Sequence, residues 1–158
     1  MPEAGSNGGP HPADASWRAA VAATAHCLTG CAIGEVLGLA LATWWGWADL
    51  PSILLAVALA FVFGYALTMR IVLAAGVGFG AAMRIALAAD TVSIATMEVV
   101  DNLIVLAVPG AMAAGLRDPL FWGSLAVALA VAFVVTVPVN RALLARGRGH
   151  AAVHAHHR

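Results

Sequence analysis

The sequence contains no lysine and few charged residues of either sign. Charged side chains make up 10% of the 158 residues, and all eight cationic side chains are arginine, whereas about a quarter of the residues in an ordinary soluble domain are charged. The formal net charge is zero, so no basic surface for nucleic acid is expected. No P-loop or dinucleotide-binding fingerprint occurs in a suitable strand-to-helix context. The composition therefore argues against nucleic-acid and nucleotide binding.

Hydrophobic residues are abundant instead, at 62% of the chain with a mean hydropathy of +0.91. A helix needs about 20 mostly apolar residues to cross the hydrocarbon core of a bilayer. Four segments meet this requirement: residues 17–47, 51–70, 81–108 and 120–141. We predict an all-α fold, a polytopic bundle of four transmembrane helices. Between the second and third spans, residues 71–80 are apolar but interrupted by glycines, and their shape is left open.

The predicted bundle occupies residues 17–145 and is flanked by two polar tails. Residues 1–16 are rich in Gly, Pro and Ala and lack large apolar side chains, which predicts a disordered tail. Residues 146–158 carry four histidines in a tract of the kind that binds metals weakly. Four crossings place both termini on one side, together with every arginine except Arg117. Because basic residues in short loops stay cytoplasmic, we expect both termini in the cytoplasm of a bacterium and the protein in its inner membrane.

The first predicted helix combines reactive side chains with a row of glycines. Cys27, Cys31 and Glu35 are spaced four residues apart and share one face. A second stripe beside them consists of Gly30, Gly34 and Gly38. Glycines at this spacing allow another helix to approach closely, and we expect that helix to come from the bundle or from a second subunit of a homo-oligomer.

The two cysteines favour a metal site over a disulfide. Side chains four apart on a helix have Cβ atoms about 5–6 Å apart, whereas a disulfide needs roughly 3.5–4.5 Å. Thiolates select soft ions such as Cu(I), with Zn(II) as the alternative, and imidazole suits both. His26 is a weaker candidate because it points about 100° away from Cys27. Buried cysteine also serves as a small hydrophobic residue, so packing alone remains the simpler interpretation.

The third predicted helix carries three acids in the stretch AADTVSIATMEVVDN. Asp90, Met97 and Asp101 fall in one narrow arc, with Glu98 and Asn102 at its edge. An acid at the centre of a membrane helix costs roughly 2.5–3.5 kcal/mol on insertion scales, and such acids typically line ion or proton paths. The structural alternative is a protonated acid that hydrogen-bonds a neighbouring helix. We expect Asp90, Asp101 and Asn102 to line an ion or proton path.

Four segments resemble a known family in sequence and in order. They are HCLTGCAIGEVLG, AADTVSIATMEVVDN, PGAMAAGLRDPLFWGSL and PVNRALLARGRGHAAVH, and the resemblance extends from His26 to His154. The chain is thereby identified as similar to the bacterial domain of unknown function 4396 family. The resemblance implies a compact helical membrane protein in which the cysteine-containing first helix and the acidic third helix are hallmarks. It implies no catalytic residue.

The residues themselves lead to three functional hypotheses. The first is a membrane protein that binds or transports a soft transition metal ion, copper before zinc. Its predicted ligands are His26, Cys27, Cys31, Glu35, Met97 and Glu98. The second is a membrane thiol oxidoreductase, which requires a break in the first helix at Gly30. The third is a structural or assembly subunit that uses the glycine stripe to join a larger complex.

Overall fold

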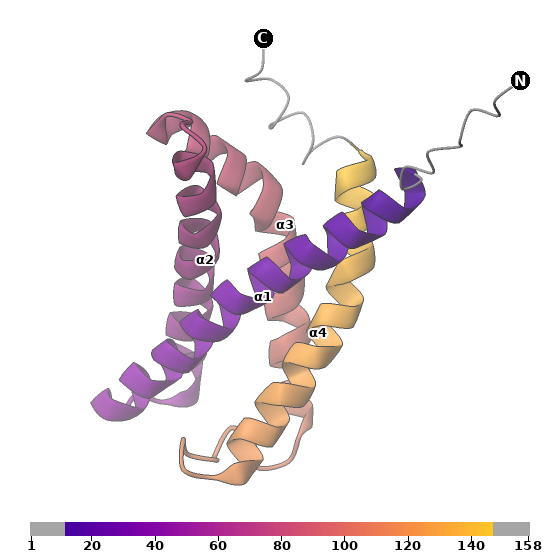
Figure 1. The fold of residues 1–158 in the computed structure, drawn as a ribbon. Coiled ribbons are helices and arrows are strands. Elements are labelled where there is room, and N and C mark those ends of the chain that lie inside the picture. The colour runs from indigo at the N-terminus through magenta and orange to yellow at the C-terminus, as the bar shows by residue number, and fades with distance from the viewer. Residues whose placement is uncertain (1–11, 147–158) are drawn as a thin grey trace, which may run out of the picture.

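The computed structural model describes residues 12–146, which form four helices (Figure 1). The helices are α1 (Pro12–Trp45), α2 (Asp49–Ala74), α3 (Phe79–Ala107) and α4 (Pro119–Ala145). The all-α prediction and the order of four helices are confirmed. Most of the predicted N-terminal tail and nearly all of the His-rich C-terminal tail lie outside the described residues.

Glycines and one cap explain where the helices end. Gly46, Gly76 and Gly110 follow α1, α2 and α3, and each has a positive φ, a backbone conformation that other residues rarely adopt. At the start of α4, the Asp118 carboxylate accepts a hydrogen bond from the backbone of Leu120 at 2.9 Å, and Pro119 fits the first turn because its missing N–H is not needed there.

Two predicted boundaries differ from the structure. α1 begins at Pro12, before the predicted start at residue 17, because Pro12, Ala13, Asp14 and Ala15 are compatible with a first helical turn. Residues 71–80, whose shape the sequence left open, do not form an element of their own. α2 continues to Ala74 and α3 starts at Phe79, so only a short connection remains, and Gly76 supplies its positive φ.

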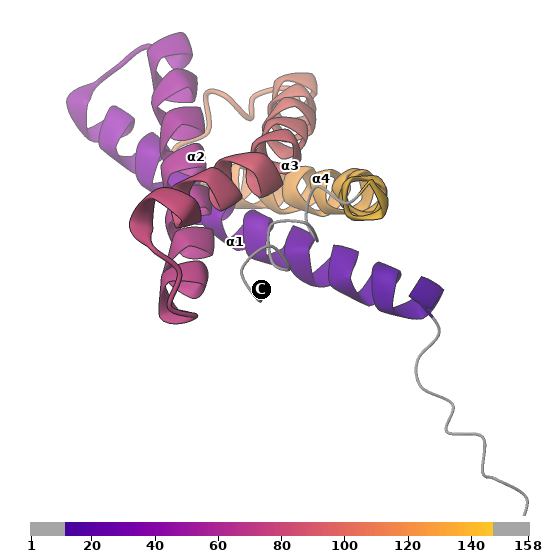
Figure 2. The same cartoon turned by 90° about the horizontal axis from the view of Figure 1, so that it is seen from above.

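The helices run alternately up and down, so the start of α1 and the end of α4 lie at the same end of the bundle (Figure 1). α1 crosses the bundle diagonally and packs most extensively on α2 (Figure 2). α1 and α3 run in the same direction. This parallel arrangement sets the order in which their polar side chains meet. Most of the described arginines belong to the end that holds both chain ends: Arg18, Arg70, Arg84, Arg141 and Arg146.

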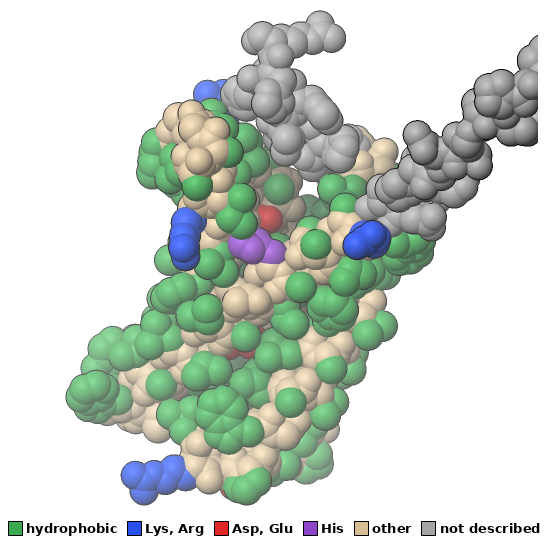
Figure 3. Space-filling model, viewed as in Figure 1, with side chains coloured by type: hydrophobic (Ala, Val, Ile, Leu, Met, Phe, Trp, Pro, Cys, Tyr) green, Lys and Arg blue, Asp and Glu red, His purple; other side chains and the backbone are tan. Residues whose placement is uncertain are grey.

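Three helices are long and apolar enough to cross a membrane: α1 from Trp17, α2 and α4. α3 has sufficient length but carries Arg84, Asp90, Glu98 and Asp101. Large hydrophobic side chains are exposed on all four helices, and they dominate the face seen in Figure 3. A water-soluble protein rarely exposes so much continuous apolar surface. By the hydropathy of its helices, the chain is a multi-pass membrane protein.

The glycine stripe of α1 is filled by α2 of the same chain. A Cβ atom added to Gly30 would lie 2.7 Å from the Cα of Gly64, and one added to Gly38 would lie 2.5 Å from the Cα of Ala56. A Cβ atom on Gly34 would overlap the backbone of Ala60. The prediction of close helix approach is therefore confirmed, and of the two partners that the sequence left open, the helix that fills the stripe is α2 of the same chain. A homo-oligomer through these glycines stays a prediction.

Candidate functional site

Three buried side chains of α1 point into the bundle. Cys27, Cys31 and Glu35 are 3%, 1% and 4% exposed. They repeat every four residues, so a straight helix carries all three on the face turned toward α3. The thiols and the acid are therefore turned into the bundle, and this agrees with the prediction that another helix packs on this side of the first helix.

α3 presents three buried acids to the same space. Asp90, Glu98 and Asp101 are 7%, 5% and 4% exposed. Their spacing of eight and three residues keeps them on one side of α3. Each acid lies at the level of a polar residue of α1.

The side chains of the two helices meet in pairs along the bundle. The Cys27 thiol donates to the Asp90 carboxyl at a Sγ to Oδ1 distance of 3.7 Å. One turn further along α1, Cys31 lies beside Glu98, and Glu35 then interacts with Asp101 and Glu98. Because α1 and α3 are parallel, the pairs keep the same order on both helices. We call these six residues, together with His26, the polar column.

His26 extends the column toward the end where the chain termini lie. Its Nε2 atom is 3.2 Å from the Thr68 hydroxyl of α2, with donor and acceptor set by the imidazole tautomer. The same ring lies close enough to Asp90 to interact with it electrostatically. His26 thus faces the neighbouring helix α2, and its ring still reaches the Asp90 end of the column. In Figure 3 the purple histidine surface lies next to a red acidic side chain, on a face with many hydrophobic side chains and a few arginines toward its edges.

Many carboxyl oxygens of the column have no hydrogen-bond partner. These buried atoms are Glu35 Oε2, Asp90 Oδ2, Glu98 Oε1, Glu98 Oε2 and Asp101 Oδ1. The groups that interact with Glu35, Glu98 and Asp101 are one another and Cys31, and no arginine from the described residues is among them. A buried carboxyl without partners is costly. The column is therefore short of positive charge and of hydrogen-bond donors.

Met97 and Asn102 take different places around the column. Met97 is 1% exposed and packs in the same core cluster as Cys27, Cys31 and Ile94. Asn102 is half-buried, and its Nδ2 atom donates to the backbone oxygen of Glu98 at 2.8 Å. Asn102 thus fixes the α3 backbone at the acidic end of the column.

The predicted metal ligands do not gather around one point. Within residues 12–146, no three His, Cys, Asp or Glu side chains form a group that could hold a metal ion. The predicted set instead spreads along the α1/α3 interface, because Cys27, Cys31 and Glu35 are separated by full turns of a continuous helix. Both cysteines are free. The column consists of pairs of possible metal ligands that follow one another along the bundle.

One polar cluster beside the column was missed by the sequence reasoning. Asn140 of α4 donates to Thr24 Oγ1 at 2.8 Å and to Ser93 Oγ at 3.0 Å, which ties α4 to α1 and α3. All three residues are buried. In the sequence Asn140 stands next to the arginines at the end of α4, so the pattern there is typical of a polar helix end. The one signal of burial was its spacing of four residues from Thr136, which puts both on the same helix face.

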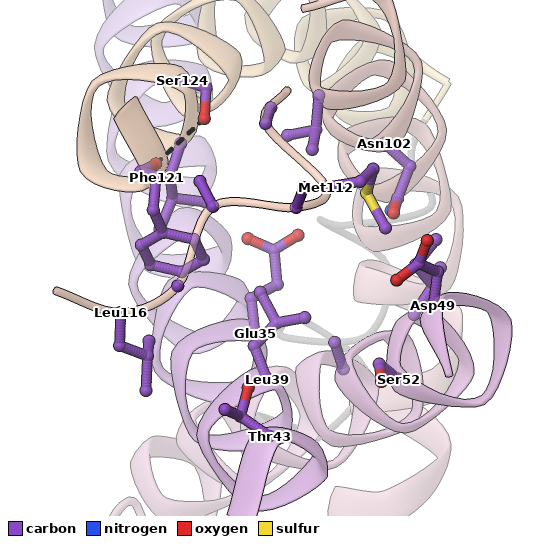
Figure 4. Close-up of a pocket in the computed structure, with 18 of the residues that line it drawn as sticks. Glu35, Leu39, Thr43, Asp49, Ser52, Asn102, Met112, Leu116, Phe121 and Ser124 are labelled. Atoms are coloured by element: carbon purple, nitrogen blue, oxygen red, sulfur yellow. Dashed lines mark hydrogen bonds between the residues drawn. The ribbon is translucent and has the colours of Figure 1, made fainter. Parts of the chain in front are cut away.

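A cavity of about 340 Å³ lies at the opposite end of the column from His26. It is enclosed by the last turns of α1 and α3, the first turns of α2 and α4, and the connection between α3 and α4. That connection is held against α4 by the indole of Trp122, which donates to the Leu116 oxygen at 2.8 Å. Glu35 projects into the centre of the cavity, as Figure 4 shows, and Asp101 also lines it. The cavity therefore leads from one end of the bundle to the polar column.

Comparison with known proteins gives a family and no function. No curated protein matches the chain, and no solved structure does either. The family described as Domain of unknown function (DUF4396) matches residues 16–149, a stretch that contains most of α1, all of α2, α3 and α4, the polar column and the cavity. The chain, with its thiol-bearing α1 and acidic α3, belongs to the DUF4396 family.

Proposed function

We propose that this membrane protein carries a soft transition metal ion, copper before zinc, along the polar column in exchange for protons. One observation carries the proposal. Buried thiols of α1 and buried acids of α3 meet in the polar column, and several of the carboxyl oxygens there have no hydrogen-bond partner. Sulfur ligands select soft ions, and buried acids in membrane helices typically mark ion paths.

Metal ligands that are arranged in pairs suit transport of an ion better than its storage. A structural metal centre encloses its ion with about four ligands, and such a cage releases the ion slowly. Conduction instead requires sites that bind strongly enough to admit the ion and weakly enough to release it. The pairs Cys27 with Asp90 and Cys31 with Glu98 provide successive sites of this kind, and the Met97 thioether lies beside them.

Proton exchange keeps the column neutral during transport. Metal-binding thiols and acids must lose their protons, so metal binding releases protons. Because no arginine of the described residues compensates the acids Glu35, Glu98 and Asp101, each arriving Cu(I) ion takes the place of one proton, and a Zn(II) ion takes the place of two. The arginine distribution supports an orientation with the cavity at the outer face of the inner membrane and His26 near the cytoplasmic face, because basic residues in short loops stay cytoplasmic.

The oxidoreductase alternative receives no support from the helix geometry. That hypothesis required α1 to break at Gly30, but α1 is continuous from Pro12 to Trp45. Instead, Gly30 packs directly on Gly64 of α2.

Uptake of Cu(I) into proteoliposomes under reducing conditions tests the proposal. The full chain should take up Cu(I) while protons leave the vesicles, reported by a pH-sensitive dye in the lumen. Cys31→Ser and Glu98→Gln should each reduce uptake at least about tenfold, because each removes one member of a donor pair. Thr29→Ala is the matched control, since exposed Thr29 bonds only the backbone of its own helix.

Two results would overturn the proposal. Uptake that is unchanged by Cys27→Ser and Cys31→Ser would exclude the thiols as ligands. Uptake without proton counterflow would exclude exchange. Loss of uptake in Thr29→Ala would show that the other variants act by disturbing the structure of α1 rather than by removing a metal ligand.

A further inference from the structure

The cavity is too large for a metal ion alone. Its volume of about 340 Å³ exceeds the share of one liquid water, about 30 Å³, roughly tenfold. Pockets for small organic molecules begin at about 300 Å³. The size therefore points to an organic ligand of modest dimensions.

All the charged side chains of the cavity are negative. Glu35 and Asp101 lie at its inner end, and Asp49 lies at the exposed start of α2. No arginine, lysine or histidine lines it. The lining therefore favours a cationic ligand over an anionic one, because an anion would face three acids.

The walls are apolar and partly aromatic. Leu39, Ile53, Val105 and Leu125 come from all four helices, and Phe121 adds an aromatic ring. Exposed Trp47 lies at the rim. Aromatic rings attract cations, and apolar walls favour a hydrocarbon body. The ligand should therefore combine one positive charge with an apolar portion.

Polar atoms at the inner end are available to such a ligand. Glu35 is 4% exposed, and its Oε2 atom has no partner, while its carboxyl points into the cavity (Figure 4). Asp101 Oδ1 is likewise buried and unpartnered. The Nδ2 atom of Asn102 already binds the Glu98 backbone, which leaves its amide oxygen free to accept a hydrogen bond.

We infer that the cavity binds a small amphipathic organic amine, with the ammonium group on Glu35 and Asp101 and the apolar body between Phe121 and the aliphatic walls. This site goes beyond the metal path, because it uses neither thiol and depends on the shape of the α3 to α4 connection. It shares only the acids at the inner end with the polar column.

Equilibrium binding of phenethylamine to the purified full chain in nanodiscs tests the inference, with 2-phenylethanol as a neutral ligand of nearly equal shape. The amine should saturate one site and bind at least about tenfold more tightly than the alcohol, because only the amine brings a positive charge to the carboxyl groups of Glu35 and Asp101. Glu35→Gln should remove most of this preference. Equal binding of the amine and the alcohol by the natural chain would overturn the inference.

A filling variant separates this site from the metal path. Ala114→Phe enlarges a half-buried residue of the cavity wall in the α3 to α4 connection and should abolish amine binding. Cys27→Ser removes a thiol of the metal path that does not line the cavity, and it should bind the amine as the natural chain does. Ala58→Phe, on the exposed face of α2, is the matched control and should bind the amine normally. Amine binding that survives Ala114→Phe, or falls equally in Ala58→Phe, would place the ligand elsewhere. Failure of Cu(I) uptake by the natural chain would leave the amine result unaffected.

Discussion

At the scale of single residues, the polar column could be predicted because its members stand out from an apolar background. Thiols at a four-residue spacing and acids inside a membrane segment are rare enough to mark a buried face before any coordinates exist. What the sequence could not provide was the pairing. Whether Cys31 meets Glu98 or Asp90 depends on the relative height of α1 and α3, which the lengths of α2 and of two connections determine.

The first residue-scale prediction concerns thiol access. Cys27 and Cys31 are 3% and 1% exposed, so N-ethylmaleimide should modify them at least about tenfold more slowly in the folded protein than after denaturation, because reaction requires local opening. A cysteine introduced at exposed Ala48, in a chain with Cys27→Ser and Cys31→Ser, should react quickly. Mass spectrometry of timed samples measures both rates. Rapid modification of the natural cysteines would show that the thiols are not enclosed.

The second residue-scale prediction concerns Asn140. Its amide joins three helices through two hydrogen bonds, and a hydrogen bond between membrane helices contributes about 0.6 kcal/mol on average and up to about 1.7. Asn140→Ala should therefore lower the free energy of unfolding by about 1–3 kcal/mol in a denaturant titration in micelles. Thr96→Ala should change it little, because Thr96 bonds only the backbone of its own helix. An unchanged stability in Asn140→Ala would remove this cluster from the forces that hold α4.

At the scale of helices, the glycine stripe shows what pattern reasoning captures and what it leaves open. The stripe Gly30, Gly34 and Gly38 predicts a close approach but does not name the partner. The missing signal was the second small-residue stripe at the same spacing, Ala56, Ala60 and Gly64, which runs antiparallel and meets the first position by position. Two stripes of equal spacing, separated by one tight turn, favour packing within the chain over packing between chains.

Substitutions along the stripe test this interpretation. Gly34→Leu should lower the free energy of unfolding by at least about 3 kcal/mol, because the added side chain would meet the backbone of α2 rather than a movable side chain. Gly123→Ala should be tolerated, since nothing lies within 4 Å of an added Cβ atom there. Thermal unfolding in micelles compares the two variants. A Gly34→Leu protein that keeps its stability and loses only its oligomeric state would instead place the stripe between subunits.

At the scale of the whole molecule, the number of helices and the membrane character follow from composition, while the cavity does not. The cavity depends on how the connection between α3 and α4 folds back, and the Trp122 indole on the Leu116 oxygen fixes this connection. Neither residue forms a recognisable motif. Of the four described helices, α1, α2 and α4 are apolar enough to cross a membrane by composition, and α3 with its charged residues is not.

The crossing of α3 is itself testable. If α3 spans the membrane with its acids facing α1, an impermeant biotin reagent applied to whole cells should label a single cysteine at Gly115 and should not label one at Gly78, in a chain without its natural cysteines. The two positions belong to the connections on either side of α3, and Gly78 lies on the cytoplasmic side in the orientation that we propose from the arginine distribution. Labelling at both positions, or at neither, would contradict a four-span bundle with this orientation.

The central claim is that the polar column binds the metal ion, and anomalous scattering at the copper edge from crystals grown with Cu(I) tests it most directly. The account predicts a peak between α1 and α3, within bonding distance of the Cys31 or Cys27 sulfur, that disappears in the Cys27→Ser and Cys31→Ser double variant. A copper peak confined to sites outside the bundle, with both thiols still beside their carboxyl partners, would contradict it.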